Sequence, residues 1–159
     1  LARVIDSHGN FLDIRKVTNK VTVDYFRYQH NNQVTLELTN LSGRECDELQ
    51  IRDLASFTLD KLGIHPDSEL SISLVDEDEM STLHMQWMDE PGPTDVLSFP
   101  MDEMKPNSSA NGPGLLGDIV LCPDFAEPQA KNAGHSLQSE LELLTVHGIL
   151  HLLGLLADV

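Results

Sequence analysis

Cysteine, long apolar runs and basic side chains are all scarce in this chain of 159 residues. Its two cysteines, Cys46 and Cys122, are too few for a disulfide framework, so a reducing compartment, the cytoplasm, is the expected location. No apolar run reaches the roughly 18 residues that a membrane span requires, and the polar start of the sequence lacks the apolar stretch of a signal peptide. We therefore expect neither a secreted nor a membrane-bound protein.

The shortage of basic residues gives the chain a strongly acidic character. Ten Lys and Arg stand against 26 Asp and Glu, for a formal net charge of -16. No Lys or Arg occurs between Pro66 and Met104. Such a charge repels phosphate backbones, which argues against DNA as a partner. An RNA substrate would have to be held by local geometry or by a metal ion.

Composition and patterning predict one domain preceded by an atypical arm. Hydrophobic residues make up 40% of the chain and charged residues 23%, the balance of a globular protein of single-domain length. Residues 1–33 hold five of the ten basic side chains and one weakly alternating stretch, 21–26. We interpret them as a poorly ordered or extraneous arm, with a marginal hairpin as the alternative. The domain is then expected to occupy residues 34–159.

Hydrophobic periodicity within residues 34–159 predicts alternating strands and helices, hence one α+β domain. Strands are expected at residues 34–41, 69–75, 95–99 and 116–121. Helices are expected at residues 47–62, after Asp76, at 125–132 and at 137–153, with Ser136 capping the last. Pro128 should end or kink the third helix. Leu49 and Trp87 are expected to face the core because they follow helical spacing.

The last predicted helix carries His147 and His151, the most informative pair in the sequence. Residues four apart lie on one helical face, so both imidazoles can reach the same metal ion. The alternative is a pair of half-buried histidines whose nitrogens are satisfied by the backbone or by water. Gly148 stands where helical zinc proteases carry the glutamate that serves as general base, which disfavours a peptide hydrolase.

Three segments, in this order and spacing, resemble the YbeY family of bacterial single-strand-specific endoribonucleases that act in ribosomal RNA maturation. The segments are PTDVLSFP at Pro93–Pro100, LGDIVL at Leu116–Leu121 and HGILHLLG at His147–Gly154. The resemblance spans roughly residues 34–154. It implies a mixed four-stranded sheet packed with helices, and a metal cleft beside the C-terminal helix. It also implies one zinc ion per chain, single-stranded rRNA as substrate, and the ribosome or ribosome-associated proteins as partners.

Through this resemblance, His147 and His151 correspond to two of the family's three zinc-binding histidines. The family motif continues Tyr-Asp-His after Gly154, but this chain has Ala157 at the position of the third histidine. Because alanine cannot bind a metal, we expect a lower affinity for zinc. The changed end is interpreted as a truncation or a shifted reading frame. Asp158 is an alternative oxygen ligand, although a solvated terminal residue is the favoured interpretation.

The resemblance also implies that Pro93–Pro100 lines the cleft, with Thr94, Asp95 and Ser98 near the substrate. Asp95 and Asp118 are candidate general bases because the matched segments contain them; the alternative is that both carboxylates are structural. Many family members carry an arginine shortly before PTDVLSFP. The corresponding position here is Met88, which weakens the case for RNA binding.

Two functions from different classes remain. The first is a zinc-dependent endoribonuclease that acts on single-stranded rRNA in rRNA processing and ribosome quality control. Hydrolysis by a metal-activated water is the preferred mechanism, and attack by the ribose 2′-OH is left open. The second is a catalytically inactive domain of the same fold that binds ribosome-associated proteins.

Overall fold

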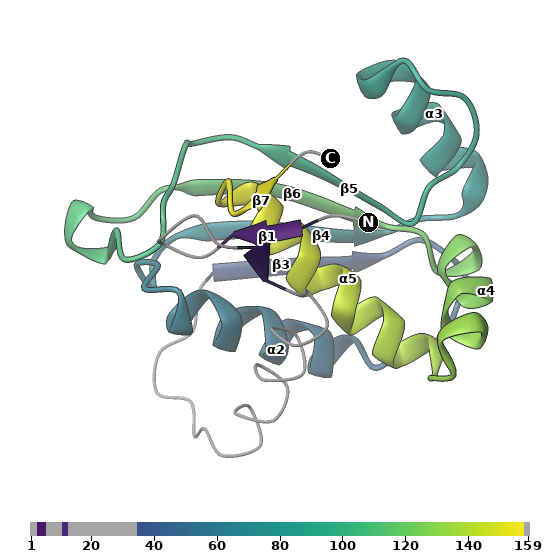
Figure 1. Ribbon diagram of the computed structural model, residues 1–159, viewed down its shortest axis with the longest axis horizontal. Coiled ribbons are helices and arrows are strands. Elements are labelled where there is room, and N and C mark those ends of the chain that lie inside the picture. Colours follow the sequence, from purple (N-terminus) through teal and green to yellow (C-terminus); the bar gives the residue numbers. More distant parts are fainter. Residues whose placement is uncertain (1–2, 6–10, 13–34, 158–159) are drawn as a thin grey trace.

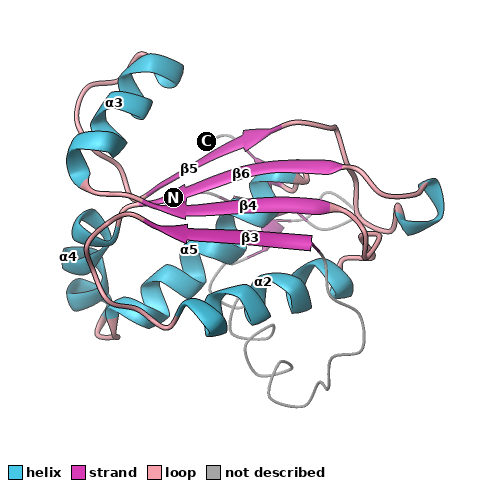
Figure 2. Ribbon diagram, turned by 180° about the vertical axis from the view of Figure 1, so that it is seen from behind, coloured by secondary structure: helices cyan, strands magenta, loops and turns pink. Residues whose placement is uncertain are grey.

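A mixed four-stranded sheet organises the computed structural model, which describes residues 3–5, 11–12 and 35–157 (Figures 1 and 2). The strands are β3 (Thr35–Asn40), β4 (Glu69–Leu74), β5 (Val96–Pro100) and β6 (Leu115–Leu121). They lie in the order β3–β4–β6–β5, with the first three parallel and β5 antiparallel to β6. The predicted α+β domain with a mixed four-stranded sheet is therefore confirmed.

Two short strands near the start of the chain pair with a strand near its end. Strand β1 (Arg3–Ile5) is antiparallel both to β2 (Phe11–Leu12) and to β7 (Leu156–Ala157). The alternating stretch 21–26 and Asp158 lie outside the described residues. The proposed boundary between an arm and a domain at residue 34 stays a prediction.

Side chains that cap the helices act at the positions expected from the sequence. The helices are α2 (Glu48–Lys61), α3 (Glu77–Met88), α4 (Pro123–Ala133) and α5 (Leu137–Leu152), with a 3₁₀ turn, η1, at Ser109–Asn111. Asp76 accepts a hydrogen bond from the backbone N–H of Glu79 at 2.8 Å, and Ser136 accepts one from Ser139 at 3.1 Å. Each bond satisfies a backbone donor that the first turn leaves without a helical partner.

Helices α2 and α5 cover one face of the sheet, which is the far face in Figure 2. Ile72 of β4, Ile119 of β6 and Leu141 of α5 are fully buried in the core between these layers. A Cβ atom on Gly148 would lie 2.9 Å from Cγ2 of Ile119. Helix α5 therefore lies so close to β6 that residue 148 has no room for a side chain.

Two expectations about burial on the helices are wrong, and the third predicted helix does not end at Pro128; a kink there stays a prediction. Leu49 and Trp87 are 68% and 61% exposed, because spacing shows which residues share a helical face but not whether that face is covered. In α3 only Met80 is buried, and Figure 1 shows this helix projecting beyond the edge of the sheet at β5. Helix α4 continues through Pro128, whose side chain is exposed. Because proline has no backbone N–H, the helix lacks only the hydrogen bond that residue 128 would otherwise donate to the carbonyl oxygen of Asp124, in the first turn.

Candidate functional site

The segment PTDVLSFP forms the loop before β5 and then β5 itself, and it fixes the carboxylate of Asp95 where the strand begins. One oxygen of Asp95, Oδ1, accepts hydrogen bonds from the backbone N–H of Val96 at 2.8 Å and from Oγ1 of Thr94 at 3.3 Å. This is the local geometry that favours aspartate at a turn. No described residue donates a hydrogen bond to the second oxygen, Oδ2, which leaves that oxygen able to accept one.

The pleat of β5 directs Ser98 to the helices. Ser98 is buried, and its Oγ donates to the carbonyl oxygen of Gly148 at 3.4 Å. The neighbouring residues Leu97 and Phe99 contact the cluster on the opposite face. Ser98 therefore connects β5 to α5 immediately after His147.

His147 and His151 lie one turn apart on α5, the first half-buried and the second exposed. Burial lowers the pKa of His147, the nearby charge of Asp95 opposes this by raising it, and His151 lowers it further. His147 is thus within electrostatic reach of both Asp95 and His151. Burial favours the neutral imidazole, whose free nitrogen can accept a proton or bind a metal.

The two histidines alone do not make a complete zinc site. A catalytic zinc ion normally takes three protein ligands and keeps one position for water. Within residues 3–5, 11–12 and 35–157, no group of three or more His, Cys, Asp or Glu residues is arranged to hold a metal ion. His147 and His151 fit zinc in chemistry and spacing, but the described donor set is one ligand short.

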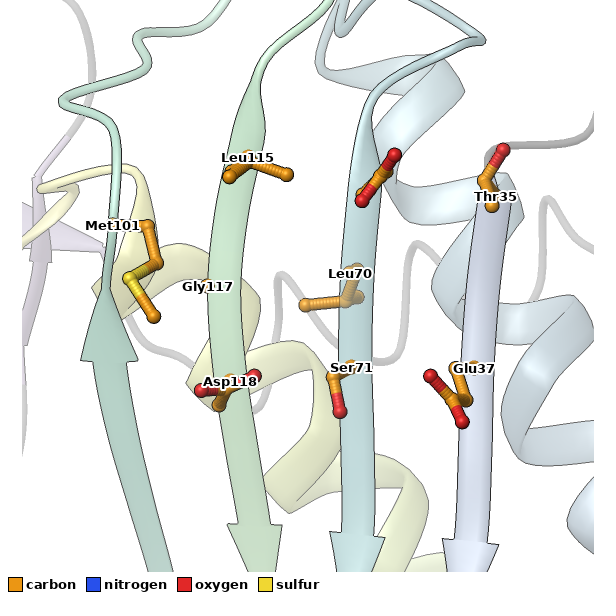
Figure 3. A pocket seen from close by; sticks show the side chains of 9 residues that line it. Thr35, Glu37, Leu70, Ser71, Met101, Leu115, Gly117 and Asp118 are labelled. Atoms are coloured by element: carbon orange, nitrogen blue, oxygen red, sulfur yellow. The ribbon is translucent and has the colours of Figure 1, made fainter.

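Asp118 lies on the other face of the sheet, away from the histidines. It stands opposite Ser71 of β4 and Phe99 of β5, and with Glu37 it lines a pocket of about 170 Å³. Figure 3 shows Asp118, Ser71 and Glu37 next to one another across three strands, with the helices behind the sheet. Met101 and Leu115 form the apolar part of this pocket. The structure thus brings Thr94, Asp95 and Ser98 to α5 but does not bring Asp118 there.

A larger pocket, of about 680 Å³, lies between the end of α4, the start of α5 and Asp95. Among the residues that line it are Asp95, Gln129, Asn132, His135, Glu140 and Leu143. We call it the α4–α5 pocket. Apart from Asp95, none of these residues was predicted to belong to the site, although Glu140 and Leu143 precede His147 by seven and four residues. Residues at this spacing share one helical face, so the sequence could have indicated that the pocket continues the face of His147.

The fold and the site define an α+β protein in which two histidines lie one turn apart on a helix that contacts β5, the strand that follows Asp95. Imidazoles and a carboxylate are groups suited to hydrolysis. The model of the family described as Endoribonuclease YbeY matches residues 16–155. The chain belongs to this family.

Relatives and a solved structure agree with this assignment. Proteins named Endoribonuclease YbeY from Acidothermus cellulolyticus and Mycolicibacterium smegmatis are 61% and 54% identical to the chain, over 127 and 125 residues. Both alignments cover 76% of this chain, and they cover 77% and 70% of the relatives. The solution structure of a Thermotoga maritima protein has a TM-score of 0.50 at 28% identity, covering 76% of this chain and 73% of that one.

No helix in the described part of this chain has the length and apolar character needed to cross a membrane.

Proposed function

We propose that this protein is an endoribonuclease that cuts single-stranded RNA, with ribosomal RNA in the cytoplasm as its substrate and zinc as its cofactor. Roles in rRNA processing and ribosome quality control, and contact with ribosome-associated proteins, belong to the same proposal. One observation carries it: His147 and His151 lie one turn apart on α5, with Asp95 close enough to His147 to act on its pKa, in a chain 54–61% identical to proteins named Endoribonuclease YbeY.

Each residue has a separate part in the proposed reaction. His147 and His151 bind the metal, and Asp95 is the general base because its Oδ2 is free to accept a proton. Thr94 is half-exposed beside Asp95 and can contact the RNA, whereas the buried Ser98 positions α5 through Gly148. When bound, zinc lowers the pKa of its water ligand to about 7 and offsets charge that develops on the phosphate.

The histidines provide the decisive test. We expect His151→Ala to lower cleavage of a 5′-labelled single-stranded rRNA fragment by more than the roughly 10–100-fold that loss of a supporting residue costs. Elemental analysis of the same samples should show that zinc bound by the unaltered protein is lost. The matched control is His65→Ala, a histidine in the loop between α2 and β4 whose Nδ1 accepts a hydrogen bond from the backbone of Asp67.

Two results would count against the proposal. One is full cleavage by the double variant His147→Ala and His151→Ala, which would remove both imidazoles from the mechanism. The other is equal cleavage of single-stranded RNA and of its duplex. Either result is interpretable only if circular dichroism shows that the variants remain folded.

Among the residues that the structure describes, the set of zinc ligands is incomplete. This favours a second candidate, an inactive member of the family that binds ribosome-associated proteins without cutting RNA. This candidate predicts no cleavage at any zinc concentration, together with retention of ribosomal proteins in a pull-down. Zinc-dependent cleavage that His151→Ala removes would exclude it.

A further inference from the structure

The α4–α5 pocket continues the helical face that carries the candidate active site. Leu143 precedes His147 by one turn of α5, about 6 Å along the helix axis. Asp95 lines the pocket, and the strand that follows it reaches α5 through Ser98, whose Oγ donates to the carbonyl oxygen of Gly148. A molecule in this pocket would therefore lie directly beside the histidines.

The polar groups in the pocket suit a neutral ligand rather than a phosphate. No Lys or Arg is among the residues that line it, and its two carboxylates would repel an anion. No described residue forms a hydrogen bond with the side-chain amide of Gln129 or Asn132, so both amides can donate to and accept from a ligand. Leu143 adds apolar surface, and a volume of about 680 Å³ is in the range of small-molecule sites.

An ion pair holds the wall of the pocket in place. Nε2 of His135, in the turn between α4 and α5, contacts Oε2 of Glu140, which is buried on the first turns of α5. Glu140 is therefore already paired, and the amides of Gln129 and Asn132 are left to bind a ligand. Oδ2 of Asp95 has more than one lone pair, so it can accept a hydrogen bond from a ligand as well as serve as the proposed base. Together these groups offer both acceptors and donors among the residues that line the cavity.

We propose that the α4–α5 pocket binds a nucleobase of single-stranded RNA next to the bond that is cut, and that it prefers guanine to uracil. Guanine presents two N–H donors beside one carbonyl acceptor, and the lining residues offer a carboxylate that accepts from N–H groups and amides that can donate to the carbonyl oxygen. Uracil presents a single N–H donor between two carbonyl oxygens. One of these oxygens would face the carboxylate and be repelled by it. The inference rests on the proposed function, because it takes RNA as the substrate.

The test compares two 5′-fluorescein-labelled hexanucleotides, hexauridylate and UUUGUU, by anisotropy titration in EDTA at about 0.15 M salt. EDTA separates base recognition from any metal and from cleavage. We expect UUUGUU to bind about tenfold more tightly, since a good base-specific pair contributes about that factor or more. Replacing its guanine with inosine, which lacks the exocyclic amino group, should remove part of this preference.

Variants locate the preference in the pocket. Gln129→Ala combined with Asn132→Ala should bring the two affinities together, while Asn111→Ala, an exposed amide on η1, should leave them apart. Melting temperatures establish that the variants are folded.

Equal binding of both hexanucleotides by the unaltered protein, or a preference that survives the double substitution, would overturn the inference. The proposed function would then still stand or fall on RNA cleavage and His151→Ala. Absence of binding to either RNA in EDTA would also overturn the inference, whereas the proposed function, in which zinc takes part, would still be decided by cleavage.

Discussion

The two faces of the sheet differ in what covers them and in what they offer chemically. The face under α2 and α5 buries Ile72 and Ile119 completely, and the candidate histidines lie at its margin. The opposite face, seen in Figure 3, exposes polar side chains such as Ser71 and Asp118 beside a small pocket. Reactive groups thus gather where a helix meets the sheet, and the open face holds carboxylates with no imidazole beside them among its pocket-lining residues.

The segment LGDIVL shows why a matched motif does not define one site. Asp118 and Ile119 are adjacent in sequence, yet Ile119 packs against Gly148 of α5 and Asp118 faces the open side. Successive side chains of a strand point to opposite faces, so a strand motif always divides its residues between two environments. Asp118 could be a general base at the histidines only if the pleat were reversed.

The largest expected contrast comes from two neighbours on β4 that face opposite sides. Ile72→Ala should lower the free energy of unfolding by about 2–5 kcal/mol, because it removes a fully buried side chain and leaves a cavity. Ser71→Ala should change it by less than about 0.5 kcal/mol, since the hydroxyl lies on the open face. Urea denaturation measures both. Equal losses would mean that the open face is covered in solution.

Gly117 should be nearly as sensitive, although it borders the open face. A Cβ atom there would approach the carbonyl oxygen of Phe99 to 2.1 Å, and the φ of +132° is one that side chains rarely adopt. Gly117→Ala should therefore cost about 3 kcal/mol through overpacking and backbone strain. The control is Gly112→Ala, where φ is +87° but no atom lies within 4 Å of the added carbon. If the two variants melt alike, the close approach of β5 to β6 is not what requires glycine.

On the covered face, Gly148→Ala should have a smaller net effect. Overpacking against Ile119 costs about 1–3 kcal/mol, while alanine in place of glycine returns roughly 1 kcal/mol of helix propensity. We expect a net loss of about 1 kcal/mol, measured by thermal melting. Adding Ile119→Val, which removes one crowding methyl group, should reduce the cost. A cost unchanged by that second substitution would show that the contact with β6 is not responsible.

The sequence predicts the local part of this structure well, because alternation and helix capping depend on neighbouring residues. The strands and the caps at Asp76 and Ser136 were predicted on that basis, and the structure confirms them. The exposure of Trp87 could not be predicted, since it depends on which helix finds a partner.

For the site, proximity in the sequence indicates His147 and His151, and the structure places Asp95 beside them. The amides of Gln129 and Asn132 carry no spacing signal. They meet α5 only because α4 folds back against it.

The smallest expected effect is on the pH dependence of stability, and it concerns Glu142 on α5. Burial raises the pKa of Glu142 above its ordinary value, a hydrogen bond from Gln138 acts in the opposite direction, and the charge of Asp47 adds to the rise. The folded chain therefore holds this proton more tightly than the unfolded chain does. The resulting stability is fully present below the unfolded pKa, about 4.3, and is lost as the pH rises through the folded value.

Glu142→Gln keeps an oxygen for Gln138 and removes the buried charge, so it should raise the melting temperature more at pH 7 than at pH 4. The comparison is Glu37→Gln on the open face, an exposed carboxylate whose replacement should change stability by less than about 0.5 kcal/mol. A gain that is the same at both pH values would mean that Glu142 is destabilising for reasons of shape rather than charge. A gain confined to neutral pH would show that burial penalises the charged carboxylate of Glu142, whereas the exposed carboxylate of Glu37 keeps its contact with water.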